Sequence, residues 1–280
     1  MTEYLLALSC PDRMGLIYAV TRWLLQSDCN VMDSDTYRDP FRERFFMRVH
    51  FSGDVPLSRL QESFEPHARE LQMRWELVRA DARPRVLIMV SRHLHCLLDL
   101  LNRVRLGQLP LDIPLIVSNH PDAEWLAKAA DIEYLHLPVT AANKPEQEQR
   151  LVREIEKHDI DFVVLARYMQ IISPTLCERL PARMINIHHS FLPGFKGAKP
   201  YHQAHRRGVK LIGATAHYVT PQMDDGPIIE QDVQTVSHRM TPEKLAAVGK
   251  DIERVVLARA VQYHARKRVL INGRRTVVFR

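Results

Sequence analysis

One stretch of the sequence contains an amide, an imidazole and a carboxylate, at Asn186, His188 and Asp224. Each group has a separate task in acyl chemistry. An Asn amide donates a hydrogen bond to a developing oxyanion, a His transfers protons near neutral pH, and an Asp orients or charges the imidazole. The three residues therefore predict catalysis at a single carbonyl group, although taken one at a time each also fits a purely structural role.

The elements around these residues are expected to bring them together. Residues 184–187 are expected to form a strand, and Asn186 and His188 stand two residues apart at its end. Side chains at i and i+2 of a strand point to the same face of a sheet. We therefore expect the amide and the imidazole to emerge side by side, whereas Asp224 lies in a turn-rich loop between two later strands.

The sequence after residue 84 alternates strands with helices. The expected strands are 85–90, 113–118, 134–137, 162–165, 184–187, 213–219 and 228–233, and the expected helices are 97–104, 122–130, 146–158 and 242–266. Repeated strand–helix units predict an α/β fold with a Rossmann-like, mostly parallel sheet covered on both faces. Sites on such sheets lie beyond the carboxyl ends of the strands, which is where His188 falls.

The first eighty or so residues have a different order of elements. Strands are expected at residues 4–8, 30–37, 45–51 and 73–78, with helices at 16–25 and 57–69. The order β-α-β-β-α-β is the ferredoxin-like arrangement. Residues 79–84 are charged and end in a proline, as an interdomain linker would. The sequence thus predicts a small domain over residues 1–82 and a catalytic domain over residues 83–280.

Composition limits the class of protein. The chain has 280 residues, 46% of them hydrophobic, and no apolar run reaches the length of a transmembrane helix. The first residues lack the features of a signal peptide, and the four cysteines form no C-x-x-C pair, so we expect a reduced, cytoplasmic protein without a membrane partner. The net charge of +6 comes from arginines spread along the chain, which argues against a nucleic-acid partner and fits a small anionic substrate.

Several histidines raise the question of a metal site. Those close in sequence to the candidate catalytic residues are His188, His189, His202 and His205. None of them stands at the spacing of a ligand motif such as H-E-x-x-H, and no cysteine or carboxylate completes one. We therefore expect no metal.

The N-terminal segment resembles an ACT domain. The resemblance rests on the run from Cys10 to Leu16, on the helix after it, and on Cys29-Asn30-Val31 at the start of the second expected strand. Gly15 would let the backbone pass close to a ligand at a helix N-terminus, where free N–H groups attract a carboxylate.

An ACT domain implies regulation or assembly. Domains of this family often bind an amino acid, here glycine or methionine, and pair their sheet edges into a homo-oligomer, a dimer or a tetramer. The residues that would bind the effector are Asp12, Arg13, Gly15, Leu16 and Asn30. The alternative is an oligomerisation module with no ligand.

Residues 84–280 resemble the formyltransferase fold of folate enzymes. The resemblance rests on Asn186-Ile187-His188 followed by Leu192-Pro193-Gly194, on the run from Asp224 to Ile229, and on residues 164–174. It implies that Asn186, His188 and Asp224 are catalytic, with Asp224 preferred to Asp225 because the family's acid stands two places before a glycine.

The same resemblance implies a folate pocket that holds the pterin ring largely by backbone groups. Its residues would be Tyr168, Met169, Gln170, Ile171, Ile172 and Met223. Gln170 departs from the family pattern, in which Arg is frequent at this position.

Two features favour hydrolysis over formyl transfer. Glycinamide ribonucleotide formyltransferases carry a glycine-rich phosphate loop after the first strand, whereas residues 91–96 of this chain contain no glycine. An ACT-like segment is also foreign to those transferases. The whole chain instead resembles the formyltetrahydrofolate deformylases.

The deformylase resemblance implies hydrolysis of 10-formyltetrahydrofolate to formate and tetrahydrofolate, without a cofactor. Asn186 would be the oxyanion donor, His188 the general acid or base, and Asp224 the group that orients His188 or the water. Such an activity would balance one-carbon folate pools and supply formate for purine synthesis. The rival functions are formyl transfer to an amine and a non-enzymatic regulator that responds to folate or an amino acid.

Overall fold

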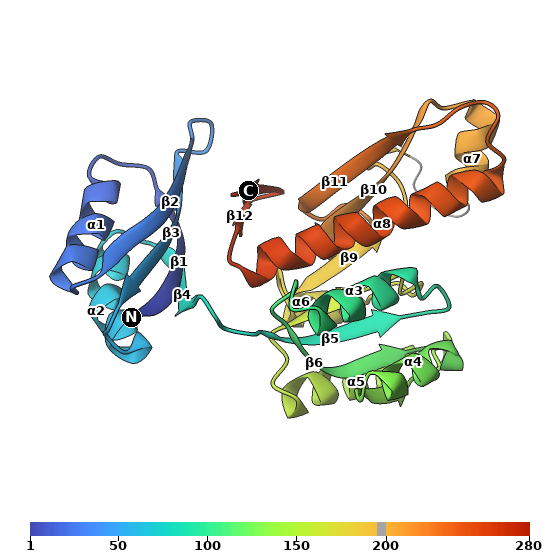
Figure 1. Ribbon diagram of the computed structural model, residues 1–280, viewed down its shortest axis with the longest axis horizontal. Coiled ribbons are helices and arrows are strands. Elements are labelled where there is room, and N and C mark those ends of the chain that lie inside the picture. The colour runs from blue at the N-terminus through green and yellow to red at the C-terminus, as the bar shows by residue number, and fades with distance from the viewer. Residues whose placement is uncertain (195–199) are drawn as a thin grey trace. The chain divides into compact units, whose positions relative to one another are not determined.

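A computed structural model describes residues 1–194 and 200–280, which form two compact units (Figure 1). The first unit comprises residues 1–82 and 263–280, and the second comprises residues 83–262. None of the helices in the described part of the chain combines the length and the apolar character that a bilayer crossing requires.

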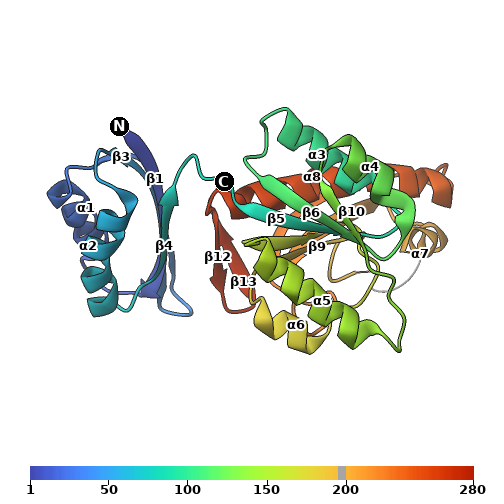
Figure 2. The same cartoon turned by 90° about the horizontal axis from the view of Figure 1, so that it is seen from below.

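The first unit, in its described residues, is built on a four-stranded antiparallel sheet in the order β2-β3-β1-β4. Its elements are β1 (Thr2–Pro11), α1 (Leu16–Gln26), β2 (Asn30–Asp39), β3 (Arg44–Gly53), α2 (Leu57–Glu70) and β4 (Arg74–Arg79). This is the ferredoxin-like order expected from the sequence. Both helices lie on one face of the sheet (Figure 2), where Trp23, Phe51 and Phe64 are buried in a common core.

The C-terminal residues belong to this first unit, so the expected extent of the catalytic domain, 83–280, is wrong at its C-terminal end. β12 (Val269–Asn272) and β13 (Arg275–Val278) form an antiparallel hairpin that the sequence did not indicate. Asp39 is fully buried, and its carboxylate needs polar partners. Asn272 donates to Asp39 Oδ2 at 2.6 Å and Arg275 contacts the same oxygen at 2.8 Å, so polar contacts attach the hairpin to this unit.

The second unit, as far as it is described, is built on a seven-stranded mixed sheet in the order β11-β10-β9-β8-β5-β6-β7. Its first elements are β5 (Arg85–Val90), α3 (His95–Arg105), β6 (Asp112–Ser118), η1 (Pro121–Ala123), α4 (Glu124–Ala129), β7 (Glu133–His136), α5 (Lys144–Lys157) and β8 (Phe162–Leu165). The later ones are α6 (Pro174–Arg179), β9 (Met184–His188), α7 (Pro200–Arg207), β10 (Leu211–Tyr218), β11 (Ile228–Thr235) and α8 (Pro242–Ala265).

Helices cover both faces of this sheet, with α3 and α8 on one side and α5 and α6 on the other (Figure 2). The central strands β5 and β8 are therefore buried on both faces, which explains their continuous apolar sequences. Strands β5 to β9 pair in parallel, whereas β10 runs antiparallel to both β9 and β11.

The pairing of β9 with β10 determines which side chains meet at the end of β9. In this register Thr215 pairs with His188 and His217 pairs with Asn186. A bulge between Ala216 and His217 shifts the pairing of β10 with β11. His217 is therefore placed directly across from the candidate oxyanion donor.

Candidate active site

The amide of Asn186 is held by a histidine on the neighbouring strand. Asn186 Nδ2 lies 3.2 Å from His217 Nε2. His217 Nδ1 lies 2.9 Å from the Tyr218 carbonyl oxygen, so the ring proton is on Nδ1 and Nε2 accepts from the amide. One N–H of Asn186 is thereby fixed, which sets the orientation of the amide.

Asp224 joins the two histidines. Its Oδ2 lies 3.2 Å from His188 Nδ1, and its Oδ1 lies 3.7 Å from His217 Nε2. Burial alone would raise the pKa of Asp224, but the hydrogen bond from His188 outweighs burial and holds the pKa well below its usual range. Asp224 is therefore a carboxylate at neutral pH.

The other nitrogen of His188 is available for chemistry. The side chain is 5% exposed, and within the described residues its Nε2 atom is buried without a hydrogen-bond partner. A buried polar atom of this kind is stabilised when a substrate or water fills the place beside it. His188 is thus oriented through Nδ1 and presents Nε2.

The loop after β10 is shaped to deliver Asp224. Asp224 has φ 52°, in the left-handed region that Asp tolerates better than most residues. Gly226 packs against the Tyr218 carbonyl so closely that an added Cβ would overlap the carbonyl oxygen. The spacing Asp-x-Gly therefore has a steric cause, because the loop returns to the strand only where residue 226 has no side chain.

All these groups face one cavity of about 660 Å³. Its lining includes Asn186, His188 and Asp224. It also includes every residue expected to bind folate, namely Tyr168, Met169, Gln170, Ile171, Ile172 and Met223. Residues from three separated parts of the sequence are thus brought to one site.

The loop between β8 and α6 forms one wall of the cavity and is held by polar contacts. Ser91 Oγ donates to Asn119 Oδ1 at 2.6 Å and accepts from Met169 N at 2.9 Å. The far end of the loop is fixed by Ser173 N, which donates to Glu148 at 2.9 Å.

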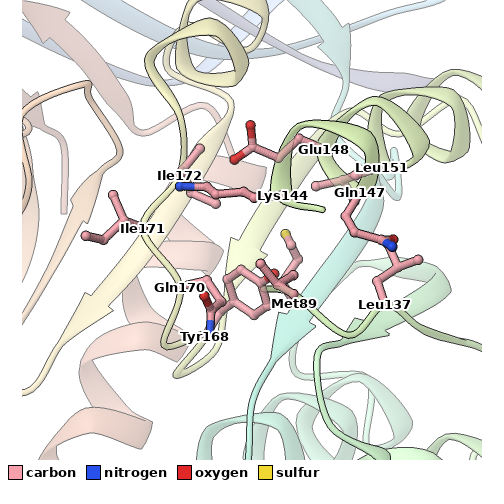
Figure 3. Close-up of a pocket in the computed structure, with 11 residues that line it drawn as sticks. Met89, Leu137, Lys144, Gln147, Glu148, Leu151, Tyr168, Gln170, Ile171 and Ile172 are labelled. Atoms are coloured by element: carbon pink, nitrogen blue, oxygen red, sulfur yellow. The ribbon is translucent and has the colours of Figure 1, made fainter. Parts of the chain in front are cut away.

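Side chains of this loop also pack toward α5. Tyr168, Gln170 and Ile172 line a smaller cavity of about 20 Å³ together with Met89 and residues of α5 (Figure 3). Burial raises the pKa of Tyr168 to about 12, so its phenol stays neutral.

Comparison with known proteins identifies the family. Residues 84–261 match the family model of formyl transferases. The chain is 46% identical over 277 residues to the formyltetrahydrofolate deformylase of Synechocystis sp.. The match covers 98% of this chain and 97% of that protein. The crystal structure of formyltetrahydrofolate deformylase from Burkholderia mallei matches it over 100% of both chains, with 50% identity and a TM-score of 0.97. The chain belongs to the formyltetrahydrofolate deformylase family.

The fold of this family extends to enzymes with a different acceptor. The crystal structure of glycinamide ribonucleotide transformylase 1 from Symbiobacterium toebii is 30% identical, with a TM-score of 0.66. It covers 71% of this chain and 95% of its own chain. The two families thus share a scaffold, so the fold alone does not determine the acceptor.

Sequence reasoning missed several polar residues of the deformylase cavity. They are Arg167, His217 and Glu253. Arg167 donates to His189 Nδ1, and burial followed by the charge of Arg167 lowers the pKa of His189 to about 3. His189 is therefore a neutral imidazole at physiological pH. Arg167 follows β8 by two residues, at the carboxyl end of a parallel strand, and that position was an available signal.

One group in the cavity wall has the chemistry of metal ligands. His95, Cys96 and Glu253 lie within ligand distance of one another. Both Glu253 oxygens are already engaged, by His95 at 2.8 Å and by Tyr201 at 2.6 Å. Arg167 lies 3.3 Å from the same carboxylate, and its charge opposes a second cation there.

The expected effector residues lie in the first unit. Asp12, Arg13, Gly15 and Leu16 surround the N-terminus of α1, and Asn30 begins β2. Gly15 has φ 86°, which favours glycine at this position. The Leu16 side chain is 3% exposed and packs in the core, so only its backbone is available to a ligand.

Proposed function

We propose that this protein hydrolyses 10-formyltetrahydrofolate to formate and tetrahydrofolate. The observation that carries the proposal is the meeting of Asn186, His188 and Asp224 in one cavity, with His188 Nδ1 3.2 Å from Asp224 Oδ2. Membership of the deformylase family supports it over the whole length of the chain.

The proposed mechanism assigns one task to each group. Water attacks the formyl carbon and gives a tetrahedral oxyanion, which accepts a hydrogen bond from the second N–H of Asn186. His188 Nε2 takes up or delivers the proton, while Asp224 stabilises the imidazolium through Nδ1. The bond from the formyl carbon to N10 then breaks, N10 gains a proton and formate leaves.

Folate binding is proposed for the two loops that line the cavity. The loop of Tyr168 to Ile172 and the residue Met223 would hold the pterin ring, mostly through backbone groups. No cofactor is required, because the folate itself carries the formyl group. In this role the enzyme would balance folate pools and supply formate for purine synthesis.

An ACT domain is proposed for the first unit. The ferredoxin-like topology and the left-handed Gly15 at the start of α1 support it. In the described residues β2 is an edge strand, and it exposes Val31, Met32 and Tyr37 by 40%, 50% and 42%. The unpaired backbone groups of an edge strand can pair with those of a second copy, and glycine or methionine is the proposed effector.

The test is a direct measurement of products. Purified protein is incubated with 10-formyltetrahydrofolate alone, and formate and tetrahydrofolate are quantified, with and without glycine or methionine. Equal amounts of both products without an added amine are expected. If no formate forms until an amine is supplied, the protein is a formyltransferase and the proposal is wrong.

A further inference from the structure

Glu253 on α8 is the centre of a buried polar network in the cavity wall. Its side chain is 1% exposed, and it contacts His95, Tyr201 and Arg167 at 2.8, 2.6 and 3.3 Å. Burial alone would raise the pKa of Glu253, but the hydrogen bond from His95, the charge of Arg167 and the hydrogen bond from Tyr201 lower it. The carboxylate therefore stays charged and holds three side chains in place.

Arg167 adopts an unfavourable backbone conformation in this network. Its φ is 64°, in the left-handed region that residues other than glycine seldom adopt. Its guanidinium contacts both His189 and Glu253. Because an apolar substitute for a buried ion pair is often equally stable, the network points to a function in shaping the site.

Tyr201 is fixed from two directions. Its hydroxyl donates to Glu253 of α8. The end of the Tyr201 ring also packs against Gly249, one turn before Glu253 on the same helix, so closely that a Cβ at Gly249 would overlap it. The Tyr201 ring centroid is 6.3 Å from that of His189, which is 5.1 Å from that of His188. A row of rings therefore runs from the proposed acid or base to Tyr201.

Tyr201 and His189 also separate two spaces. They line the 660 Å³ cavity and a second cavity of about 390 Å³, whose lining is mostly apolar. These two rings are thus part of the wall between the cavities. Removal of the Tyr201 ring would join them.

We propose that Tyr201 determines the acceptor of the reaction, because its ring separates the cavity of His188 from the second cavity, which would otherwise be open to a primary amine. This assignment depends on the proposed hydrolysis of 10-formyltetrahydrofolate. The transformylase scaffold is shared, so the fold alone does not select water. In hydrolysis the formyl carbon gains a C–O bond from water. In transfer it gains a C–N bond from an amine that loses a proton, and in both reactions the bond to N10 breaks and N10 gains a proton.

The experiment compares Tyr201→Ala with the matched control Tyr201→Phe, using glycinamide as the probe amine. Formate and N-formylglycinamide are quantified by mass spectrometry at saturating 10-formyltetrahydrofolate. The wild type and Tyr201→Phe are expected to give formate only, because both keep the ring. Tyr201→Ala is expected to give both products, with N-formylglycinamide at least about tenfold above the detection limit that the wild type sets.

Gly249→Ala provides a second variant, since its new methyl group displaces Tyr201 without removing it. It is expected to form N-formylglycinamide as well. If Tyr201→Ala shows no cooperative unfolding transition, and so is not folded, Gly249→Ala is the variant that tests the assignment. A folded Tyr201→Ala that releases formate but no N-formylglycinamide at any amine concentration would overturn the assignment. So would a wild type that formylates glycinamide. A wild type that releases no formate in the absence of amine refutes the proposed hydrolysis instead.

Discussion

Replacement of Asp224 by Asn removes one charge from the site while keeping the size of the side chain. Asp224 Oδ2 lies 3.2 Å from His188 Nδ1, and the carboxylate is 15% exposed. At this separation and an effective dielectric constant near 20, a carboxylate and an imidazolium attract by roughly 5 kcal/mol. Since 1.4 kcal/mol corresponds to a factor of ten, that attraction sets an upper limit near 10³–10⁴-fold, and we expect kcat to fall by about 10²–10⁴-fold.

The assay is formate release at saturating 10-formyltetrahydrofolate, with kcat and KM determined separately. KM is expected to change little, because the proposed pterin contacts are made by backbone groups and by other residues. Asp225→Asn is the matched control, since Asp225 is the exposed neighbour of Asp224, and it should keep near-normal turnover. An Asp224→Asn enzyme with wild-type kcat would refute the assignment of the carboxylate.

Four further predictions concern stability and reactivity. The folded state lowers the pKa of Asp224 from its usual 3.8, so the ionised carboxylate stabilises the fold above pH 3.8 and this contribution is lost as the pH falls through the folded-state pKa. The unfolding free energies of the wild type and Asp224→Asn should therefore converge in acid, as measured by circular dichroism. Gly226→Ala should lower the unfolding free energy by about 1–3 kcal/mol and reduce turnover, because its methyl group would overlap the Tyr218 carbonyl; a wild-type Tm would contradict the close packing. Arg167→Met should lower the free energy of unfolding in urea by about 3–5 kcal/mol, because it leaves the Glu253 carboxylate buried without the guanidinium. The double variant Arg167→Met/Glu253→Gln should recover part of that loss, and purely additive effects would exclude the ion pair as the cause. Burial raises the pKa of all four cysteine thiols, so Ellman's reagent should react slowly with the native protein. After unfolding it should label four thiols per chain, and rapid labelling of the native state would show that the packing is looser than described.

The strands and most helices could be predicted because they follow regular hydrophobic patterns. The ferredoxin-like order of the first unit and the buried runs at β5 and β8 are confirmed. Placement of Asn186 and His188 in one cavity also followed from sequence, because alternation along a strand puts residues i and i+2 on one face. The short helices α6 and α7 and the C-terminal hairpin were missed, since each has too few residues for a period to show.

The rest of the site depends on pairing between distant segments. His217 reaches Asn186 through the antiparallel register of β9 and β10, and no local pattern in either strand encodes that register. Glu253 looks like an exposed acid on a helix until its partners His95, Arg167 and Tyr201 are seen to surround it. Buried polar groups are stabilised by partners far away in sequence, so they are the residues that a reading of local patterns overlooks.

The two histidines beside Asp224 have different partners, and this difference separates their tasks. Both ring nitrogens of His217 are engaged, Nδ1 by the Tyr218 carbonyl and Nε2 by the Asn186 amide. A ring held at both nitrogens transfers a proton to a ligand only by breaking one of these hydrogen bonds. His188 is held at Nδ1 by Asp224, while its Nε2 has no protein partner in the part of the chain that is described. We infer that His188 moves the proton with the support of Asp224, and that His217 positions the oxyanion donor.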